Sequence, residues 1–440
     1  MRFATWLFIA IMVCSPALAQ TPEKTEPSFP AITQSVSISE AVEIALKNNP
    51  RISSQSAMAR AAQARVGMAK AMTRPRLSAT TFATTGTFPS IIAGPPAVDP
   101  MPIMSTPNER QLDQNLMAMY PLYTGGRLKG QVGNARGLAK GAEAEAAGAR
   151  LDVALDAKTA YRRALLASRF VEAYQKRVDE GRERLRIAQA AFDEGKIAKY
   201  DLLRNQTDLA ESEQALVNAQ RDVEIAQVDL KTALGLSLES KLTLTDQLAA
   251  QPGALPLADL QALALRQRPE ISAARARIQA VQATTILAKS AYKPQVYAIA
   301  MQDFASTSGS SFDSGYTVGV VAGFPIFDGG QRKSAVKEAR AMADQAEADL
   351  RSAQLAVSRE VGTAWAESVA AATNTELAKA AVEQAEEDYR VIKLRYEAGK
   401  AINVEVLDAL AALTRAETNY AQALYELNAA QDRLARAVGT

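Results

Sequence analysis

The chain has 440 residues, with 50 Lys and Arg against 48 Asp and Glu, no His and a single Cys. The lack of His removes imidazole as a catalytic base or metal ligand, and one Cys excludes an intrachain disulfide and a cysteine zinc site. The nearly balanced charge lacks the basic footprint of a nucleic-acid-binding protein. The composition therefore argues against imidazole and cysteine metal sites and against a nucleic-acid partner; we expect no metal and no cofactor, which a passive conduit would not need. Its 6% aromatic content favours long, closely packed helices.

The N-terminus has the pattern of a secretory signal peptide, expected over residues 1–19. A basic residue precedes the apolar run at 6–13, and an A-x-A site predicts cleavage after Ala19. The run is too short to span a bilayer, which takes about 20 residues. Because Cys14 precedes this site, we expect it to leave with the signal. The alternative is a lipoprotein cysteine, but Met12 and Val13 are not the small residues that lipid attachment favours. Residues 20–36 are expected to form an extended lead-in.

The chain contains an internal repeat. Ala45–Ile52 returns as Ala264–Ile271 at an offset of 219. Tyr120–Gly126, a Pro-x-aromatic-x-Gly-Gly segment, returns as Phe324–Gly330 at an offset of 204. The first half therefore carries 15 extra residues, which lie in a proline-rich loop expected to be exposed. The two repeats are assigned to residues 37–250 and 251–440.

Each repeat is expected to run through a short helix, a second helix that begins at a proline, a strand, a loop and a second strand. A very long helix, a tight turn and a return helix follow. The first repeat has predicted strands at about 76–88 and 112–123, a long helix at 127–194 and a return helix at 198–234. The second has predicted strands at about 295–304 and 316–327, a long helix at 331–398 and a return helix at 402–438. Each long segment has 68 residues without Pro, and such a helix would extend roughly 100 Å.

The strands have the alternation expected of a membrane wall. Tyr316, Val318 and Val320 share one apolar face, and the opposite face is small. An ordinary half-buried hairpin would show the same alternation. No stretch of about 18 uncharged apolar residues follows the signal, so no membrane-spanning helix is predicted. Because four strands are too few to close a barrel in lipid, several chains would have to pool their strands.

These features resemble the TolC-like outer membrane efflux protein family over nearly all of the mature chain. The marks are the Ala-Leu-x-x-Asn-Asn-Pro opening, its Arg-Pro-Glu-Ile twin and the two Pro-x-aromatic-x-Gly-Gly corners. Arg395–Gly399, followed by Val404–Ala409, resembles the inner hairpin of the family. The corner residues matched by this resemblance are Pro121, Gly125, Gly126, Pro325, Gly329 and Gly330.

The resemblance implies an α+β membrane protein: a long-helix α-barrel continuous with a trimeric 12-strand antiparallel β-barrel, with four strands from each chain. The homotrimer would sit in the outer-membrane lipid, with its helical tunnel in the periplasm. It would be a passive exit duct for small molecules such as drugs, working with a periplasmic adaptor protein and an inner-membrane transporter.

The resemblance also assigns roles to the turns at the far ends of the long helices. In similar proteins these tips contact the adaptor, and the matching residues are Gly195, Lys196, Gly399, Lys400 and Arg395. Glycine at such a position would also serve simply to end a helix, by taking the left-handed conformation.

Two further pairs match the channel entrance of the family. Glu405 and Asp408 are three residues apart and share a helix face, so three copies would form two carboxylate rings that favour cations. Tyr396 and Asp201 match a latch that holds the entrance shut by hydrogen bonds. The alternatives are a solvated face for the acids and interhelix packing for Tyr396. The family has an Arg where this chain has Ala401, so that part of the latch is missing.

Three other functions are weighed. Within the family, the alternative to small-molecule efflux is the outer-membrane component of a type I protein secretion system. A periplasmic coiled-coil scaffold would explain the helices but not the duplicated strand pairs. An enzyme with paired carboxylates, as in glycosidases, is the remotest alternative, because no two acids are placed in a recognisable pocket.

Overall fold

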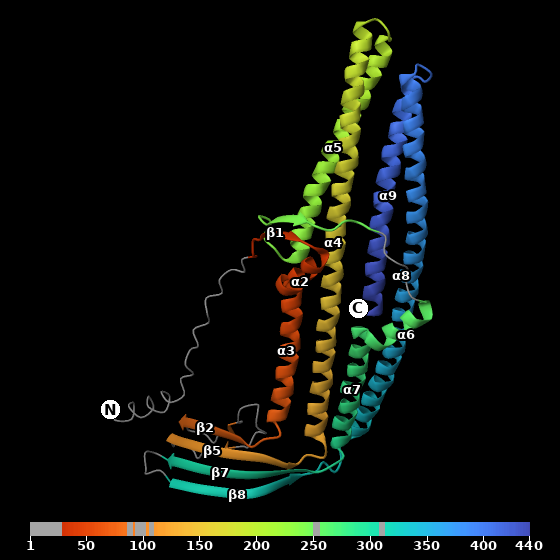
Figure 1. Ribbon diagram of the computed structural model, residues 1–440. Coiled ribbons are helices and arrows are strands. Elements are labelled where there is room, and N and C mark those ends of the chain that lie inside the picture. Colours follow the sequence, from red (N-terminus) through yellow and green to blue (C-terminus); the bar gives the residue numbers. More distant parts are fainter. Residues whose placement is uncertain (1–28, 86–90, 93–102, 105–109, 250–255, 308–312) are drawn as a thin grey trace, which may run out of the picture. The chain divides into compact units, whose positions relative to one another are not determined.

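The computed structural model describes residues 29–85, 91–92, 103–104, 110–249, 256–307 and 313–440 (Figure 1). The expected signal peptide, 1–19, lies outside these residues. The chain forms two compact units. The first comprises Met1–Asn49 and Arg163–Gln247, and the second Pro50–Arg162 and Leu248–Thr440. This division crosses the two sequence repeats, because the long helix α4 contributes to both units.

The helices of the two repeats have equal lengths in pairs of 11, 22, 67 and 36 residues. The first repeat contains α2 (Ile38–Asn48), α3 (Pro50–Ala71), α4 (Arg127–Asp193) and α5 (Lys199–Leu234). The second contains α6 (Leu257–Gln267), α7 (Pro269–Ser290), α8 (Gln331–Glu397) and α9 (Asn403–Val438). The return helices begin one residue later than expected, because Ala198 and Ile402 are extended N-cap residues. Among the described residues, no helix combines the length and apolar character needed to cross a bilayer.

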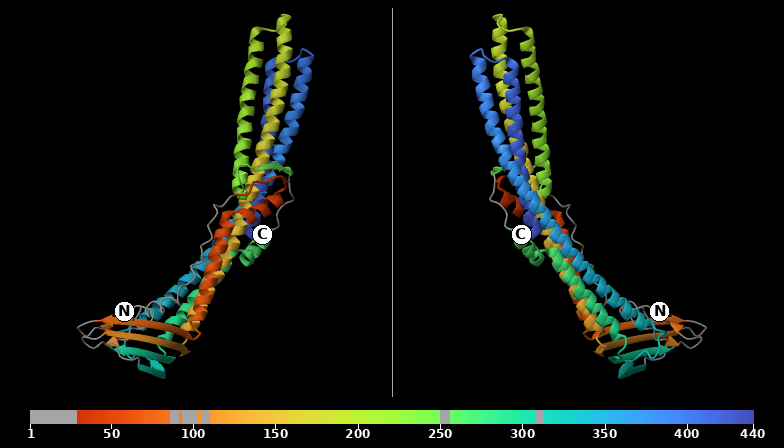
Figure 2. Two further views of the ribbon diagram at one scale, coloured as in Figure 1. Left: turned by 90° about the vertical axis from the view of Figure 1, so that its left-hand side faces the viewer. Right: turned by 90° about the vertical axis from the view of Figure 1, so that its right-hand side faces the viewer.

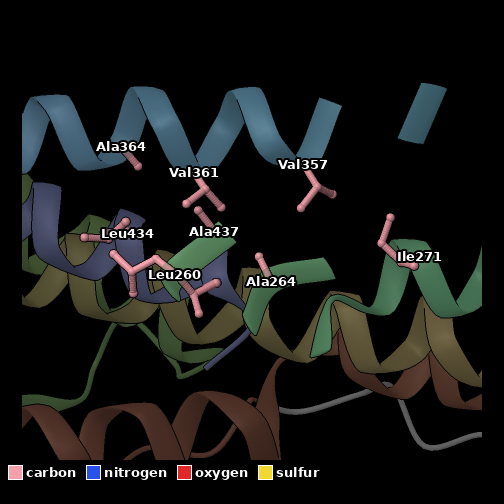
Figure 3. Close-up of a cluster of buried hydrophobic side chains, with 9 residues drawn as sticks. Leu260, Ala264, Ile271, Val357, Val361, Ala364, Leu434 and Ala437 are labelled. Atoms are coloured by element: carbon pink, nitrogen blue, oxygen red, sulfur yellow. The ribbon is translucent and has the colours of Figure 1, made fainter. Parts of the chain in front are cut away.

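The core of the second unit joins its four C-terminal helices. Its buried residues come from α6, α7, α8 and α9 (Figure 3): Leu260, Ala264, Ile271, Val357, Val361, Ala364, Leu434, Ala437 and Val438. Complete burial of a side chain such as Val361, which is 0% exposed, contributes about 1.5–3 kcal/mol.

A buried arginine joins α9 end-on to α7. The α9 helix ends with carbonyl groups that have no partner within the helix. Arg268, only 2% exposed, precedes α7, and its Nη1 donates to the carbonyls of Arg436 and Ala437, each at 3.1 Å. In the first unit Asn49 has the same role, donating through Nδ2 to the carbonyl of Ala233 at 3.0 Å. Both repeats thus satisfy the end of the return helix with the residue just before a proline.

The second unit also holds a four-stranded antiparallel sheet in the order β2-β5-β7-β8 (Figure 1). The strands are β2 (Arg76–Thr85), β5 (Arg110–Tyr123), β7 (Gln295–Thr307) and β8 (Asp313–Gly323). Leu116 of β5 lies opposite Ala79 of β2 and Gln302 of β7, so the two repeats meet at the centre of the sheet. Two short strands, β3 (Ile91–Ile92) and β4 (Ile103–Met104), pair within the proline-rich loop.

The strand expected at about 316–327 was misplaced at both ends. It begins at Asp313 and stops at Gly323. Proline has no N–H to donate to a sheet, so Pro325 is poorly suited to continue the ladder. The carbonyls of Pro325 and Ile326 instead accept hydrogen bonds from the side chain of Arg332. The strand expected to end at about 304 continues to Thr307, and the one expected from about 112 begins at Arg110.

Part of the expected extended lead-in is a strand in the first unit. There β1 (Thr33–Val36) pairs in parallel with β6 (Lys241–Leu244), and Val36 is 1% exposed. A capping box begins α2: the Ser37 hydroxyl accepts from the Glu40 N–H, while the Ser37 N–H donates to the Glu40 carboxylate at 2.7 Å. The pairing of β1 with β6 anchors the N-terminal segment to the first unit.

Candidate functional site

The two hairpin tips have the same backbone geometry. Gly195 and Gly399 have φ of 71° and 70°, which L side chains rarely adopt. The next residue in each turn donates its N–H back to the helix, from Lys196 to Ala191 and from Lys400 to Arg395, each at 2.8 Å. These are the long bonds of a Schellman ending. A Cβ at either glycine would meet no atom within 4 Å, so the turns expose open backbone surface.

The charged side chains at the tips are exposed and make short-range contacts. Lys196 lies 2.5 Å from the Glu194 carboxylate in the first unit. Arg395 bridges the second turn, donating to the Lys400 carbonyl at 3.3 Å and lying 4.0 Å from the carboxylate of Glu405. Exposed pairs of this kind contribute about 0–1 kcal/mol. Arg395 therefore helps to order the turn, and its charge lies beside one of the predicted pore acids.

The predicted pore acids lie on the solvent-accessible side of the α9 N-terminus. Asp408 is exposed and Glu405 is partly exposed, whereas Val406 and Leu407 between them are buried. The i,i+3 spacing therefore presents both carboxylates away from the hairpin interior. The structure places both acids on one face within a single chain. The carboxylate rings, which need three chains, remain a prediction.

The predicted latch residues belong to different units. Asp201 is in the first turn of α5, where its backbone carbonyl accepts from Asn205 Nδ2 at 2.8 Å. Tyr396 is near the end of α8, and its ring packs against a cluster that includes Tyr389, Val406 and Leu410. The interhelix packing considered for Tyr396 is therefore present. Its pairing with Asp201 remains a prediction.

The two strand–helix corners also differ. In the first, Gly125 has φ 62°, and a Cβ there would lie 2.6 Å from Lys293 Cβ and 2.9 Å from the Ser290 carbonyl. Glycine is therefore needed for both backbone conformation and space. At the second corner, Gly329 and Gly330 have φ of 61° and 92° with open space around them, so only conformation requires glycine.

A charged clamp at the second corner was not foreseen. Asp328 Oδ2 accepts from the N–H of Arg332 at 2.9 Å and from its Nε at 2.6 Å, and Oδ1 accepts from the N–H of Gly330 at 3.1 Å. The N–H of Arg332, then its side chain, and then the N–H of Gly330 hold the pKa of the Asp328 carboxyl below its usual range. The first repeat has Thr124 and Leu128 at these positions, so the repeat carried no signal for the clamp.

A second feature missed from the sequence is a charged seam inside the α4/α5 hairpin of the first unit. Asp208 lies 2.9 Å from Arg177 and 3.7 Å from Arg184. The side chains of these residues are 16%, 18% and 13% exposed. Among the described residues, no hydrogen-bond partner reaches the guanidinium nitrogens of Arg184. Two arginines thus share one carboxylate in a largely buried setting.

Comparison with known proteins places these features in one family. The model of the family described as "Outer membrane efflux protein" matches residues 41–236 and 260–440, which covers most of both repeats.

Within the described residues, no group of three acidic or thiol side chains could hold a metal ion.

Individual relatives agree with that match. The pyoverdine export outer membrane protein OpmQ of Pseudomonas putida is 24% identical over 385 residues, covering 87% of this chain and 81% of the relative. The outer-membrane channel OprN has a TM-score of 0.76 at 24% identity, over 91% of this chain and 89% of OprN. The CmeC channel of Campylobacter jejuni also has a TM-score of 0.76, at 18% identity, over 91% of this chain and 85% of CmeC.

The two solved structures, OprN and CmeC, are described as outer-membrane channels, and this chain shares their fold of long helices joined to a β-domain. The resemblance found in the sequence is confirmed. The chain therefore belongs to the outer membrane efflux protein family.

Proposed function

We propose that this channel works as a homotrimer, whose three four-stranded sheets close one 12-strand barrel and whose helices form a continuous periplasmic tunnel. It would be the passive exit duct of a tripartite assembly, driven by an inner-membrane transporter through a periplasmic adaptor. The observation that carries this proposal is the pair of open sheet edges in each chain.

Within the described residues, β2 pairs only with β5 and β8 pairs only with β7. An unpaired strand edge in lipid would leave N–H and C=O groups without partners, at several kcal/mol each. Four strands are too few to close on themselves, since membrane barrels begin at about eight. Pairing β8 of one chain with β2 of the next removes every open edge and keeps the antiparallel order.

The apolar face of β8 supports a place in lipid. Tyr316, Val318 and Val320 are 81%, 73% and 63% exposed in the single chain. The opposite face carries Thr317 and Gly319, which leave room for a lumen. Large exposed apolar side chains in this alternation would be unfavourable in water and favourable against acyl chains.

Cysteine crosslinking between the edge strands tests this assembly. The expected mature chain has no thiol, so Ser78→Cys on β2 can be combined with single cysteines along β8 from Tyr316 to Ala322. Oxidation in outer-membrane fractions should give covalent trimers for cysteines at matching register. Leu116→Cys on the central strand β5, combined with the same β8 positions, is the control and should give none. Monomers throughout the β8 scan would contradict the trimer.

The tips supply the proposed gate and adaptor contact. Glu405 and Asp408 already share a solvent-accessible face, so three copies around an axis would form acidic rings favouring cations. The exposed turns at Lys196 and Lys400 are suited to contact a partner. A photo-crosslinker at Lys400 should capture the adaptor, whereas one at Lys379, farther along α8, should not.

The cargo is proposed to be small molecules. The name of the Pseudomonas putida relative refers to pyoverdine export and not to secretion of a protein, and this favours efflux over type I secretion. Deletion of the gene should raise cellular retention of efflux substrates without blocking the secretion of proteins.

A further inference from the structure

Nearly all of α3 and α7, together with the ends of α4 and α8 that lie beside the sheet, carry a charge that the total composition hides. These stretches and their corners contain 17 Lys and Arg residues but only two acids, Asp328 and Glu338. Their formal charge is +15, against +2 for the complete chain. We call them the basal band, and its segments are residues 52–76, 124–142, 271–294 and 324–341.

The fold of the second unit brings the four segments together. Val66 of α3 packs against Ala139 of α4, and Asn134 of α4 donates to the Ala280 carbonyl of α7 at 3.1 Å. The α7 and α8 helices pack along each other. Figures 1 and 2 show the ends of α3, α4, α7 and α8 side by side where the strands begin. Cations from four places in the sequence thus lie on neighbouring helices.

Most of this charge is exposed and uncompensated. Among the described residues, Arg332 is the one cation of the band that forms an ion pair with an acid, Asp328. The exposed cations are Arg60, Arg65, Lys70, Arg74, Arg76, Lys129, Arg136, Lys140, Arg275, Arg277, Lys289, Lys293, Lys333, Lys337 and Arg340. Like charges at this density repel one another, so the surface favours an anionic partner.

Exposed apolar side chains near the corner between β8 and α8 indicate the kind of partner. Ile326 and Phe327 are 90% and 89% exposed. The guanidinium of Arg332 lies 5.2 Å from the Tyr292 ring centroid and 5.9 Å from that of Phe324. Exposed aromatics beside Lys and Arg are typical of the boundary between acyl chains and headgroups. A surface for a water-soluble anion would not need the protruding Ile and Phe.

We propose that the part of the basal band nearest the strands binds anionic phospholipid headgroups of the leaflet that faces the periplasm. This inference rests on the proposed function, which puts the sheet in the membrane. Attraction to an anionic surface falls off within a Debye length of about 10 Å, so only the nearest cations take part. Arg74, Lys289, Lys293 and Lys333 are four of these nearest cations, and we call these four the proximal set. Arg60, Arg65, Arg275 and Arg277 lie roughly 15–25 Å farther along their helices and form the distal set.

Two quadruple variants with the same loss of charge test the proposal. All four residues of the proximal set, or all four of the distal set, are changed to Gln. Each protein is reconstituted as a trimer in nanodiscs of phosphatidylethanolamine with a minor share of phosphatidylglycerol, and retained lipids are counted by native mass spectrometry. Wild type and the distal variant should both enrich phosphatidylglycerol. The proximal variant should lose at least about fivefold of that enrichment, the factor expected for one cation at an anionic surface. High salt should remove the enrichment from wild type.

Equal enrichment in the proximal variant and wild type would overturn the proposal. An equal loss in both variants would also overturn it, because it would show that total charge, and not the position of the cations beside the strands, sets the enrichment. Circular dichroism and the trimer band establish that each variant is folded. Failure of wild type to enter the bilayer as a trimer would reject the proposed function itself, and that result is seen before any lipid is counted.

Discussion

The α4/α5 hairpin of the first unit and the α8/α9 hairpin of the second have equal lengths and matching glycine turns, but different interiors. The first encloses Asp208 between two arginines. The second is held by an apolar cluster that includes Tyr389, Val406 and Leu410. At the offset of 204, Asp208 corresponds to Ala412 and Leu410 to Gln206.

This difference separates what the repeat preserves from what it leaves free. Turn geometry and helix length are the same in both hairpins. The interior is free to be polar or apolar, provided that it keeps the helices together. Burying charge carries a desolvation cost that apolar packing avoids, so the first hairpin should open locally more easily than the second.

The largest effect is expected from Asp208→Ala. The change leaves Arg177 and Arg184 largely buried without their carboxylate, and loss of one partner of a buried pair costs about 3–5 kcal/mol. Hydrogen exchange should show that the free energy of opening falls by about this amount in the first hairpin and stays unchanged in the second. Asp222→Ala, which removes an exposed acid from the same helix, is the control and should stay within about 0.5 kcal/mol. Similar effects from both would mean that the seam contributes no stability.

Leu410→Ala should break the apolar interior of the second hairpin. Removing a buried leucine costs about 2–5 kcal/mol, through lost transfer energy and the remaining cavity. Hydrogen exchange along α8 and α9 near the tip should accelerate accordingly. The matched control is Gln206→Ala at the exposed equivalent position of the first hairpin. If Leu410→Ala reduced protection from exchange no more than Gln206→Ala does, the apolar cluster would not be the source of stability.

The latch would couple the two hairpins. Tyr396→Phe keeps the packed ring but removes the hydroxyl, and Asp201→Ala removes the proposed acceptor. A hydrogen bond to a charged group contributes about 1.5–3 kcal/mol, so the double variant should conduct more than wild type in planar bilayers. Tyr420→Phe, far from the tip, should not. Unchanged conductance in the double variant would end the latch hypothesis.

The tips should respond alike, because their geometry is shared. Gly195→Ala and Gly399→Ala each place a Cβ in the left-handed region, at about 1–2 kcal/mol, with no clash to add. Hydrogen exchange at the two turns should increase by similar amounts. A much larger effect at one tip would show that its glycine is held by something beyond backbone conformation.

The smallest effect on stability is expected at the pore acids. Glu405→Ala with Asp408→Ala removes charges from an accessible face, so stability should change by less than about 1 kcal/mol. Ion selectivity in planar bilayers should lose its preference for cations, together with block by multivalent cations. Glu426→Ala, farther along α9, serves as the control. Selectivity and block that survive in the double variant would reject the acidic rings.

Much of the fold could be predicted from the residues. Proline positions, the double glycines and the absence of proline over 68 residues locate the helices, because backbone geometry limits where a helix begins and ends. The end of β8 was predicted less well, since alternation continues through Phe324 while Pro325 cannot extend the ladder. Of the candidate site, the turns and the shared face of Glu405 and Asp408 follow from spacing alone.

The remaining features depend on contacts between distant segments. Arg268 looks like a surface residue in the sequence, yet it is buried because two carbonyls of α9 end beside it. The charged seam requires Arg177 and Arg184 of α4 to lie opposite Asp208 of α5. Spacing along the chain does not encode such pairings.

The sequence by itself determined the duplicated architecture and the family, because helix breakers, glycine turns and strand alternation act locally. Only the tertiary structure decided where charge accumulates. The near balance of 50 basic and 48 acidic residues conceals a band of +15 assembled from four separate segments. Electrostatic potential depends on distance in space, so a chain that is almost neutral in total can still carry a strongly basic surface beside its strands.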